Sequence, residues 1–215
     1  MKSILITATN TDIGKTYTTI KLIAELSKRG FQVGVFKPIE TGVQEIAYDA
    51  QLLLDNCQIY NKNFNNINIK DVAPITYQLP AAPYVSKGKS KIEFSKIAQA
   101  FDKLSKHCDI LLIESAGGLL TPIEKNYYMI DLANYFKVTS TLLITDEKLG
   151  CINNTLLSIE ALESRAIPFT WCVNLKEKNS SFDQVSLPYF QEKFERVLTV
   201  QKDIENIANN LLSPE

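Results

Sequence analysis

Short apolar runs alternate along the chain with longer segments in which apolar residues recur every three or four positions. The short runs are typical of buried strands, and the longer segments predict helices. The predicted strands are 4–8, 33–36, 109–114, 141–145 and 169–174. The predicted helices are 15–29, 46–54, 93–107, 128–136 and 154–164. At least one helix therefore separates each strand from the next.

The first strand, the first helix and the second strand form the clearest unit of this pattern. Gly30 follows the helix 15–29, at the position where a left-handed residue often ends a helix. Lys37-Pro38 ends the strand 33–36, because proline lacks the N–H group that a strand ladder needs. A β-α-β unit of this kind is expected to have a right-handed crossover.

Two segments depart from the alternation. The asparagine-rich stretch 56–68 predicts an irregular surface excursion, since asparagine favours turns. Residues 183–212 predict an amphipathic helix with a proline at position 188. No repeat or low-complexity linker divides the chain, so we expect a single domain over 1–215 whose last part, about 183–215, is a divergent helical tail.

Strands that alternate with helices predict an α/β fold, a doubly wound and mostly parallel sheet with helices on both faces. Ligands of such sheets bind beyond the carboxyl ends of the strands. The segments that follow the predicted strands are TNTDIGKT, KPIETG, ESAGG, DEKLGCIN and NLKE. Each is rich in polar residues, glycine or both, so we expect one composite site at this edge of the sheet.

The composition excludes several classes of protein. The 215 residues are 45% hydrophobic and 22% charged with a formal net charge of −1, which indicates a globular protein without a basic surface for nucleic acid. No apolar stretch reaches the roughly 20 residues that span a bilayer, and the N-terminus lacks the apolar region of a signal peptide. Widely spaced cysteines without a C-x-x-C pair favour a reduced, cytoplasmic protein.

The first strand leads into a segment that is typical of a phosphate-binding loop. Gly14, Lys15 and Thr16 supply a glycine, a lysine for the outer phosphates and a hydroxyl for magnesium, at the start of a helix whose dipole favours anions. The usual pattern would place glycine at position 9, which is Thr9. A chance Gly-Lys-Thr is the alternative, and the flanking strand and helix argue against it.

Carboxylates and a second lysine complete the candidate site. Glu114 ends a buried strand beside the loop and is the first candidate to bind Mg²⁺ with Thr16, since magnesium prefers hard oxygen ligands. Asp49 is a further candidate, although a lone aspartate on a polar helix face is more often solvated. Lys37 follows a strand and either neutralises a transferred phosphoryl group together with Lys15 or lies along the surface.

Four motifs in this order resemble those of the dethiobiotin synthetases, a family with a phosphate loop one residue longer than usual and a P-loop NTPase-like fold. They are ATNTDIGKT at 8–16, KPIETG at 37–42, ESAGGLLTP at 114–122 and KLGCIN at 148–153. Each follows a predicted strand, and together with the asparagine at 174 they extend the resemblance to about residue 175. The longer loop explains the absence of glycine at position 9.

The chain also departs from the family pattern. Ala8 replaces the first loop glycine, and we expect an ordinary backbone conformation there with the phosphate cradle retained. Ser115 replaces another glycine at the phosphate rim. The family's L-G-x-[IL]-P segment, which wraps the nucleotide base, has no counterpart in 183–215. We therefore expect weak discrimination among nucleoside triphosphates, which parallel titrations of ATP, GTP and CTP test.

The resemblance implies a ligase of biotin biosynthesis. Such an enzyme uses Mg²⁺, ATP and carbon dioxide or bicarbonate to close a ureido ring on 7,8-diaminononanoate, giving dethiobiotin, ADP and phosphate. It also implies a homodimer whose substrate lies at the subunit interface, with no nucleic acid or membrane as a partner. The chemistry needs no protein nucleophile, so His107, the single histidine, is assigned no role.

Residue roles follow from the same resemblance. The implied catalytic residues are Lys15, Lys37 and Thr11, and the implied magnesium ligands are Thr16, Asp49 and Glu114. The implied nucleotide-binding residues are Asp12, Ile13, Gly14, Lys15, Thr16, Tyr17, Asp49, Glu114, Ser115, Ala116, Gly117, Asn174 and Leu175. The implied substrate-binding residues are Thr41, Gly118, Lys148, Leu149, Gly150, Cys151, Ile152 and Asn153.

Three other functions are weighed against this one. A partitioning or maturation ATPase, a switch that binds protein partners, usually has a second lysine early in the loop, where this chain has Thr9 and Asn10. An amidating synthetase of corrinoid acids would need an added glutaminase domain, for which the chain is too short. A serine hydrolase elbow at Ser115 would need glycine where Ile113 stands.

Overall fold

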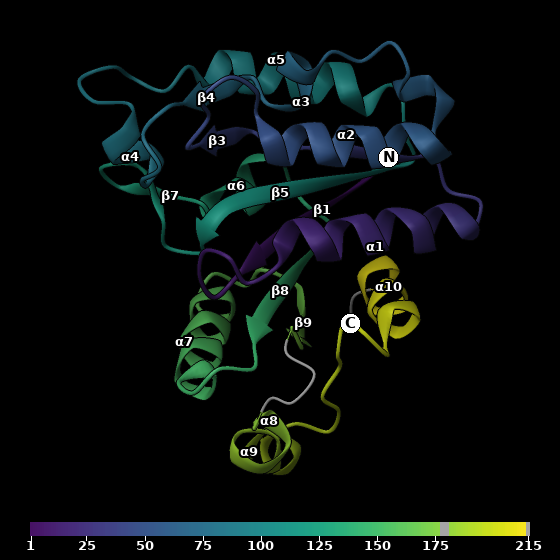
Figure 1. Cartoon of the computed structure of the whole chain (residues 1–215), viewed down its shortest axis with the longest axis vertical. Helices are drawn as coiled ribbons and strands as arrows, with labels where there is room; N and C mark the ends of the chain where they lie inside the picture. The colour runs from purple at the N-terminus through teal and green to yellow at the C-terminus, as the bar shows by residue number, and fades with distance from the viewer. Residues whose placement is uncertain (177–180, 214–215) are drawn as a thin grey trace.

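The centre of the computed structural model, which describes residues 1–176 and 181–213, is a parallel five-stranded sheet with the order β2-β5-β1-β8-β9 (Figure 1). The strands are β1 (Lys2–Ala8), β2 (Val33–Phe36), β5 (Ile110–Gly118), β8 (Ser140–Asp146) and β9 (Phe169–Asn174). All five predicted strands are confirmed, because each apolar run is buried in this sheet.

Helices flank the sheet on both sides, which confirms the predicted doubly wound α/β fold. α1 (Lys15–Lys28) packs on β1, β2 and β5 and contacts α2 (Tyr48–Tyr60) and α10 (Ile204–Leu212). α5 (Phe94–Ser105) packs on β2, and α7 (Cys151–Glu163) packs on β8. In Figure 1 the chain enters α1 directly from the carboxyl end of β1.

The asparagine-rich stretch is more ordered than predicted, so the expected irregular excursion over 56–68 is wrong. α2 extends to Tyr60, beyond the predicted end at residue 54, and is followed by η1 (Lys62–Phe64) and α3 (Ile69–Val72). Phe64 is fully buried and belongs to the main hydrophobic core. A buried aromatic side chain therefore outweighs the turn preference of the neighbouring asparagines.

Two small ribbons lie beside the main sheet and were not predicted. β3 (Ile39–Thr41) pairs in parallel with β4 (Ile75–Tyr77), and β6 (Pro122–Glu124) pairs with β7 (Tyr127–Tyr128) in antiparallel fashion. β7 occupies the start of the helix predicted over 128–136, so that helix is reduced to α6 (Asp131–Tyr135). A short helix, α4 (Pro83–Ser86), begins at a proline in its first turn.

The tail is helical but is not the one amphipathic helix predicted over 183–212. It consists of α8 (Phe182–Val185), α9 (Leu187–Lys193) and α10, with extended chain between α9 and α10. This extended chain runs beside β9, where the Val173 N–H donates to the Leu198 carbonyl (2.8 Å) and the Val200 N–H donates to the Val173 carbonyl (2.9 Å). The tail thus covers the outer edge of the sheet.

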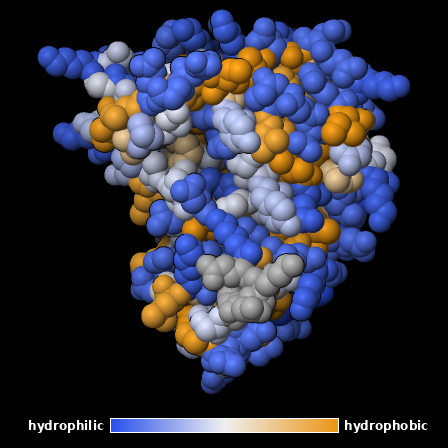
Figure 2. Space-filling view, viewed as in Figure 1, coloured by the Kyte–Doolittle hydropathy of each residue, from blue (hydrophilic) through white to orange (hydrophobic). Residues whose placement is uncertain are grey.

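The surface view shows mostly hydrophilic residues on this face, interrupted by small groups of hydrophobic ones (Figure 2). Among the helices described over 1–176 and 181–213, none is long and apolar enough to cross a membrane. Because all five strands of the main sheet are parallel, their carboxyl ends meet at one edge, where the loops with the polar motifs emerge (Figure 1).

Candidate active site

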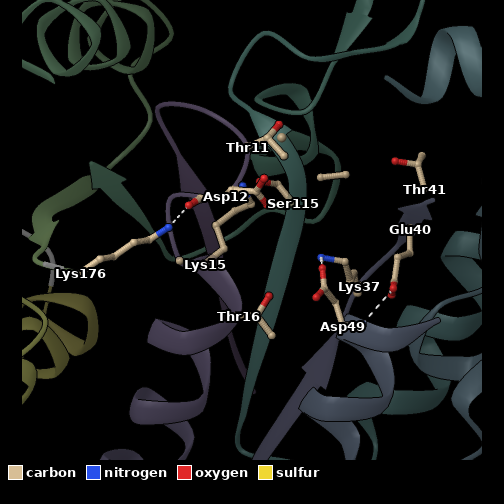
Figure 3. Close-up of a pocket in the computed structure, with 13 residues that line it drawn as sticks. Thr11, Asp12, Lys15, Thr16, Lys37, Glu40, Thr41, Asp49, Ser115 and Lys176 are labelled. Carbon is tan, nitrogen blue, oxygen red and sulfur yellow. Dashed lines mark hydrogen bonds and ion pairs between the residues drawn. The ribbon is translucent and has the colours of Figure 1, made fainter. Parts of the chain in front are cut away.

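A cavity of about 390 Å³ lies at the carboxyl ends of the strands (Figure 3). It is lined from β1 by the phosphate loop, from β2 and β3 by the second motif, from β5 by the third and from β9 by a lysine. The lining residues are Thr11, Asp12, Gly14, Lys15, Thr16, Lys37, Glu40, Thr41, Asp49, Ser115, Ala116, Gly117 and Lys176. With Asp49 from the start of α2, the structure thus brings five segments of the chain into one site.

The phosphate loop joins β1 to α1 in a conformation that only glycine suits at its last position. Gly14 has φ 103°, and an added Cβ atom there would lie 2.1 Å from Asn174 Nδ2. Asp12 also has a positive φ of 57°. Ala8, which replaces the family's first glycine, ends β1 and is not among the residues with positive φ, as expected. The loop therefore keeps its turn without a glycine at position 8.

Lys15 lies at the base of this cavity, almost fully buried. Its ammonium group donates a hydrogen bond to the Asn10 carbonyl at 3.0 Å. Burial, and next the nearby charge of Lys37, lowers the pKa of the Lys15 ammonium to about 8. Lys15 is therefore held without a direct carboxylate partner in the described structure, which leaves its charge available for an anion.

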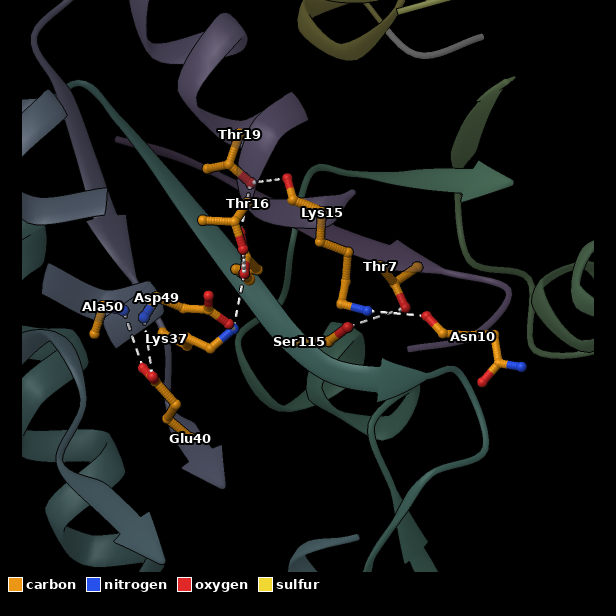
Figure 4. Close-up of polar contacts among 11 residues, drawn as sticks. Thr7, Asn10, Lys15, Thr16, Thr19, Lys37, Glu40, Asp49, Ala50 and Ser115 are labelled. Atoms are coloured by element: carbon orange, nitrogen blue, oxygen red, sulfur yellow. Dashed lines mark hydrogen bonds and ion pairs between the residues drawn. The ribbon is translucent and has the colours of Figure 1, made fainter. Parts of the chain in front are cut away.

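Figure 4 shows Thr16, Thr19 and Lys37 close together beneath the cavity, and all three donate hydrogen bonds to Glu114. Its side chain is fully buried. Oε1 accepts hydrogen bonds from Thr16 Oγ1 (2.8 Å) and from Lys37 Nζ (2.7 Å), and Oε2 accepts one from Thr19 Oγ1 (2.8 Å). A buried carboxylate is tolerated because it is paired and hydrogen-bonded in this way.

Lys37 lies between two carboxylates, with only 3% of its surface exposed. Its Nζ atom is 2.7 Å from Glu114 Oε1 and 3.1 Å from Asp49 Oδ2. Burial alone would lower the pKa of Lys37, but the two carboxylates outweigh burial and raise that pKa above the usual lysine value. Of the two predicted alternatives for Lys37, a lysine at the transferred phosphoryl group or a surface lysine, the surface position is wrong. Lys37 is a buried cation at the cavity wall.

The oxygen donors around this cation suit magnesium. Thr16 offers a hydroxyl, and Asp49 and Glu114 offer carboxylates, which are the hard ligands that Mg²⁺ prefers. The Lys37 ammonium bridges both carboxylates, so positive charge is already accommodated there. Within residues 1–176 and 181–213, no group of three or more His, Cys, Asp or Glu side chains could hold a metal. Mg²⁺ usually binds one or two protein carboxylates and completes its shell with water and phosphate oxygens, so Thr16, Asp49 and Glu114 would be enough to hold it.

Two cavity residues escaped prediction. Glu40 lies in the second motif, and its carboxylate accepts hydrogen bonds from the backbone N–H groups of Asp49 (3.0 Å) and Ala50 (2.9 Å). Lys176 follows β9 and donates from Nζ to the Asp12 carbonyl across the phosphate loop. Each contact joins segments that are distant or irregular in sequence, and only the position of these residues just after strands could have indicated them.

A family model described as an AAA domain matches residues 2–205 of the chain. An ATP-dependent dethiobiotin synthetase BioD of Sulfurovum sp. (strain NBC37-1) is 46% identical over 211 residues, which cover 98% of this chain and 100% of that protein. The chain belongs to the dethiobiotin synthetase family. A synthetase of the same name from Wolinella succinogenes is 38% identical, with 99% of both chains covered.

Two solved structures of other proteins resemble the chain in fold. A plasmid partition protein from Borrelia burgdorferi superposes with a TM-score of 0.57 at 15% identity, covering 98% of this chain and 97% of that one. The MinD cell division protein of Aquifex aeolicus superposes with a TM-score of 0.53 at 16% identity, covering 98% and 87%. At such identities the likeness shows the P-loop NTPase-like fold alone. The partitioning alternative gains nothing beyond that fold, whereas the dethiobiotin synthetases match in sequence over the full length.

Some residues that the dethiobiotin synthetase family implies lie outside the main cavity. The Ile13 side chain is buried in the core, and Tyr17 points outward with 46% of its surface exposed. Ser115 lines the cavity, while its hydroxyl donates to Thr7 Oγ1 at 3.1 Å. Of positions 12–17, Asp12, Gly14, Lys15 and Thr16 line the cavity, whereas Ile13 and Tyr17 do not.

The asparagine expected at the nucleotide base already has partners on both sides of its amide. Asn174 Nδ2 donates to the Ile13 carbonyl (2.8 Å), and Asn174 Oδ1 accepts from Gln201 Nε2 (2.8 Å). Gln201 Oε1 also accepts from the Leu175 N–H at 3.1 Å. The tail thus reaches Asn174 and Leu175 through Gln201.

The segment 148–153, which the family uses for its substrate, also lies apart from the main cavity. Leu149 is 90% exposed, and Gly150 precedes α7 with φ 98°. A second cavity of about 360 Å³ lies between the phosphate loop, the third motif and α7. Its lining residues are Thr9, Asn10, Gly118, Leu119, Leu120, Thr121, Asn154, Leu157, Ser158 and Ala161. Gly118 alone of the implied substrate residues lines this second cavity.

Proposed function

We propose that the chain is an ATP-dependent dethiobiotin synthetase, a ligase of biotin biosynthesis that forms C–N bonds. The observation that carries this proposal is the convergence of Lys15, Lys37 and Glu114 at one cavity, in a chain that matches curated synthetases over nearly its full length. The partitioning ATPase remains the alternative, and it rests on fold alone.

The reaction joins 7,8-diaminononanoate to carbon dioxide. One amine adds to carbon dioxide and loses a proton, giving a carbamate. A carbamate oxygen then attacks the γ-phosphorus of ATP, so that the bond to ADP breaks and a carbamic–phosphoric anhydride forms. The second amine attacks the anhydride carbon, phosphate leaves, and the ureido ring closes. Positioning and charge neutralisation suffice for these steps, which fits a site whose polar groups are mainly lysines, carboxylates and hydroxyls.

The chain's own residues would divide these tasks. Lys15 would neutralise the outer phosphates, while Lys37 would stabilise the charge on the transferred phosphoryl group. Thr11 lines the same cavity and would donate its hydroxyl to that group. Thr16, Asp49 and Glu114 would hold Mg²⁺, which supplies charge neutralisation for the triphosphate.

The remaining contacts follow the geometry of the two cavities. Backbone groups of positions 12–17 and 115–117 would bind the triphosphate, and Asn174 with Leu175 would face the base. Thr41 lines the main cavity and would contact the diamine or its carbamate. We place Gly118 at the substrate as well, since it lines the second cavity beside the loop.

A homodimer would bring the last motif to the substrate. Residues 148–153 lead into α7 and form its first turn, and none of them lines the main cavity, so they would serve the site of the neighbouring copy. Exposed leucines at positions 120, 149 and 157 surround the second cavity and this motif, and they would be covered in such a dimer. Sedimentation at micromolar concentration tests the proposal, and a monomer under assay conditions would contradict it.

All four cysteines are free thiols, in keeping with a cytoplasmic location.

A product assay tests this function. Purified protein with diaminononanoate, bicarbonate and Mg-ATP should form dethiobiotin, identified by its mass, with one phosphate released per product. Phosphate release should depend on the diamine. Release at the same rate without diamine, and no dethiobiotin, would instead support the switch ATPase.

The variant Lys37→Ala tests the catalytic assignment in the same assay. Turnover should fall by roughly 100- to 1,000-fold, since a preorganised cationic donor at the reacting phosphate is lost. Nucleotide should still bind, because Lys15 and the loop remain. Lys96→Ala is the matched control, since Lys96 forms an exposed ion pair with Glu93 on α5 (2.7 Å). A Lys37→Ala enzyme that is folded by circular dichroism and turns over normally would remove Lys37 from the mechanism.

A further inference from the structure

Helix α2 begins without a cap of its own. Its N-cap residue is Ala47, whose side chain makes no capping hydrogen bond. The first N–H groups of a helix lack partners within the helix and need an acceptor from elsewhere. Glu40, which precedes the helix by several residues, supplies it: Oε1 accepts from the Asp49 N–H (3.0 Å) and Oε2 from the Ala50 N–H (2.9 Å).

The Glu40 carboxylate is itself held firmly. Glu40 lies in β3, where its neighbours pair in register with β4 (Ile39 opposite Ile75 and Thr41 opposite Tyr77). Only 6% of its surface is exposed. Both carboxylate oxygens therefore point at the helix start, where the helix dipole favours negative charge. Figures 3 and 4 show Glu40 beside Asp49, at the wall of the cavity.

This cap acts on one residue of the proposed metal site. The Asp49 N–H group is fixed by Glu40, while the Asp49 carboxylate lies 3.1 Å from Lys37 Nζ. The Asp49 side chain is 43% exposed, so packing alone does not fix its direction. The backbone anchor to Glu40 and the ion pair with Lys37 are therefore the contacts that constrain where its carboxylate lies.

We propose that Glu40 is a positioning residue that, by capping α2, holds Asp49 in place to ligate Mg²⁺. This inference rests on the proposed role of Asp49 as a magnesium ligand. Both Glu40 oxygens accept backbone N–H groups at the start of α2, so its contacts are those of a helix cap. Its effect on the reaction passes through Asp49 and thus through the metal.

The binding of a non-hydrolysable ATP analogue tests this proposal without turnover. Isothermal titration with AMP-PNP, once with excess Mg²⁺ and once with EDTA, gives the factor by which the metal strengthens binding. In Glu40→Gln this factor should fall roughly 10-fold, as is usual when a partner of a metal ligand is removed. Binding in EDTA should stay unchanged, because Lys15 and the loop are intact. An unchanged metal factor in Glu40→Gln would overturn the proposal.

Three further variants make the result specific. Asn68→Ala removes the side-chain cap of α3, where Asn68 Oδ1 accepts from the Lys70 N–H (2.9 Å), and should leave the metal factor unchanged. Ala47→Ser, added to Glu40→Gln, gives α2 a local cap and should restore the factor; a double variant that folds but regains nothing would contradict the proposal. Asp49→Asn reports on the metal site itself. If Asp49→Asn leaves the metal factor unchanged, Asp49 is not a magnesium ligand. If Asp49→Asn lowers the metal factor but Glu40→Gln leaves it unchanged, Asp49 is a ligand and Glu40 does not position it.

Discussion

Two lysines share the main cavity but lie in opposite electrostatic surroundings. Lys37 Nζ contacts the carboxylates of Glu114 and Asp49, which keep it protonated. Lys15 Nζ contacts only the Asn10 carbonyl among described residues, and burial lowers its pKa to about 8. Lys37 is therefore a permanent cation, whereas the charge of Lys15 depends on pH.

This difference predicts how nucleotide affinity changes with pH. The pKa of Lys15 is lowered from 10.5 to about 8. The ammonium group is therefore protonated at pH values well below about 8, and it loses its charge as the pH rises through that value. Anionic ATP binds the protonated form, so affinity should be highest below about pH 8 and should fall as the pH increases towards about 9. Titration calorimetry in buffers of different ionisation enthalpy should also detect proton uptake on binding in this range.

Lys15→Arg is the matched control for this prediction. Arginine stays charged throughout the range, so the pH dependence should disappear in this variant even if its affinity is lower. The unmodified protein could instead bind ATP equally well below about pH 8 and near about pH 9, with no proton uptake. This result would show that Lys15 stays charged over the range and would contradict a lowered pKa for Lys15.

At the residue scale, a local motif was enough to indicate residues that line the cavity. Lys15 and Thr16 were predicted because the loop, the strand before it and the helix after it occur together, and the structure lines the cavity with both. Glu40 and Lys176 were not predicted, because their partners lie in other segments: the start of α2 and the Asp12 carbonyl. Such contacts depend on tertiary structure and leave no spacing pattern.

At the scale of elements, the asparagine-rich stretch carries a structural residue. Asn61 is fully buried between α2 and η1. Its Nδ2 atom donates to the carbonyls of Val33 and His107, both at 3.0 Å, and its Oδ1 atom accepts from the Asn63 N–H at 3.0 Å. One amide thus ties this segment to β2 and to the chain that leads into β5.

Asn61→Ala should therefore destabilise the fold. Loss of the amide removes three hydrogen bonds and, within the described part of the chain, leaves the Val33 carbonyl with only the weak Cys57 thiol donor (3.1 Å), so the free energy of unfolding should fall by about 2 kcal/mol. Asn65→Ala, an exposed position in the same stretch, should change it by less than about 0.5 kcal/mol. Urea denaturation followed by circular dichroism measures both. Equal, small effects would mean that Asn61 does not hold this segment.

The strands were predictable because each is a short apolar run buried in the sheet, whereas two other segments were not. The stretch 56–68 has a polar composition, yet the Phe64 side chain is buried in the core and anchors the stretch there. The tail contacts β9 through the backbone of residues 198–200, and backbone pairing carries no side-chain signature. Weak discrimination among nucleotide bases stays a prediction, and the engagement of Asn174 by Gln201 is in keeping with it.

For the whole molecule, the alternation of strands and helices was enough to predict the architecture and the edge of the sheet at which the site lies. The parallel order β2-β5-β1-β8-β9 brings the carboxyl ends of all five strands together. The chain carries a net charge of only −1, yet lysines 15, 37 and 176 all line the main cavity. Asp12, Glu40 and Asp49 line it as well, so the lysines bring cations to the place where an anionic nucleotide would bind while carboxylates balance their charge. The alternation of apolar and polar residues describes how one chain folds, so it could not predict how two copies would assemble.

The central claim is that this cavity transfers the γ-phosphoryl group of ATP to a carbamate rather than to water. Bicarbonate labelled with ¹⁸O, supplied in unlabelled water and sampled before the label exchanges, distinguishes the two. The carbamate oxygen stays with phosphorus when the ring closes, so the released phosphate should carry one labelled oxygen that originates from carbon dioxide. Phosphate without the label would show that water attacks ATP, and the proposed chemistry of the site would be wrong.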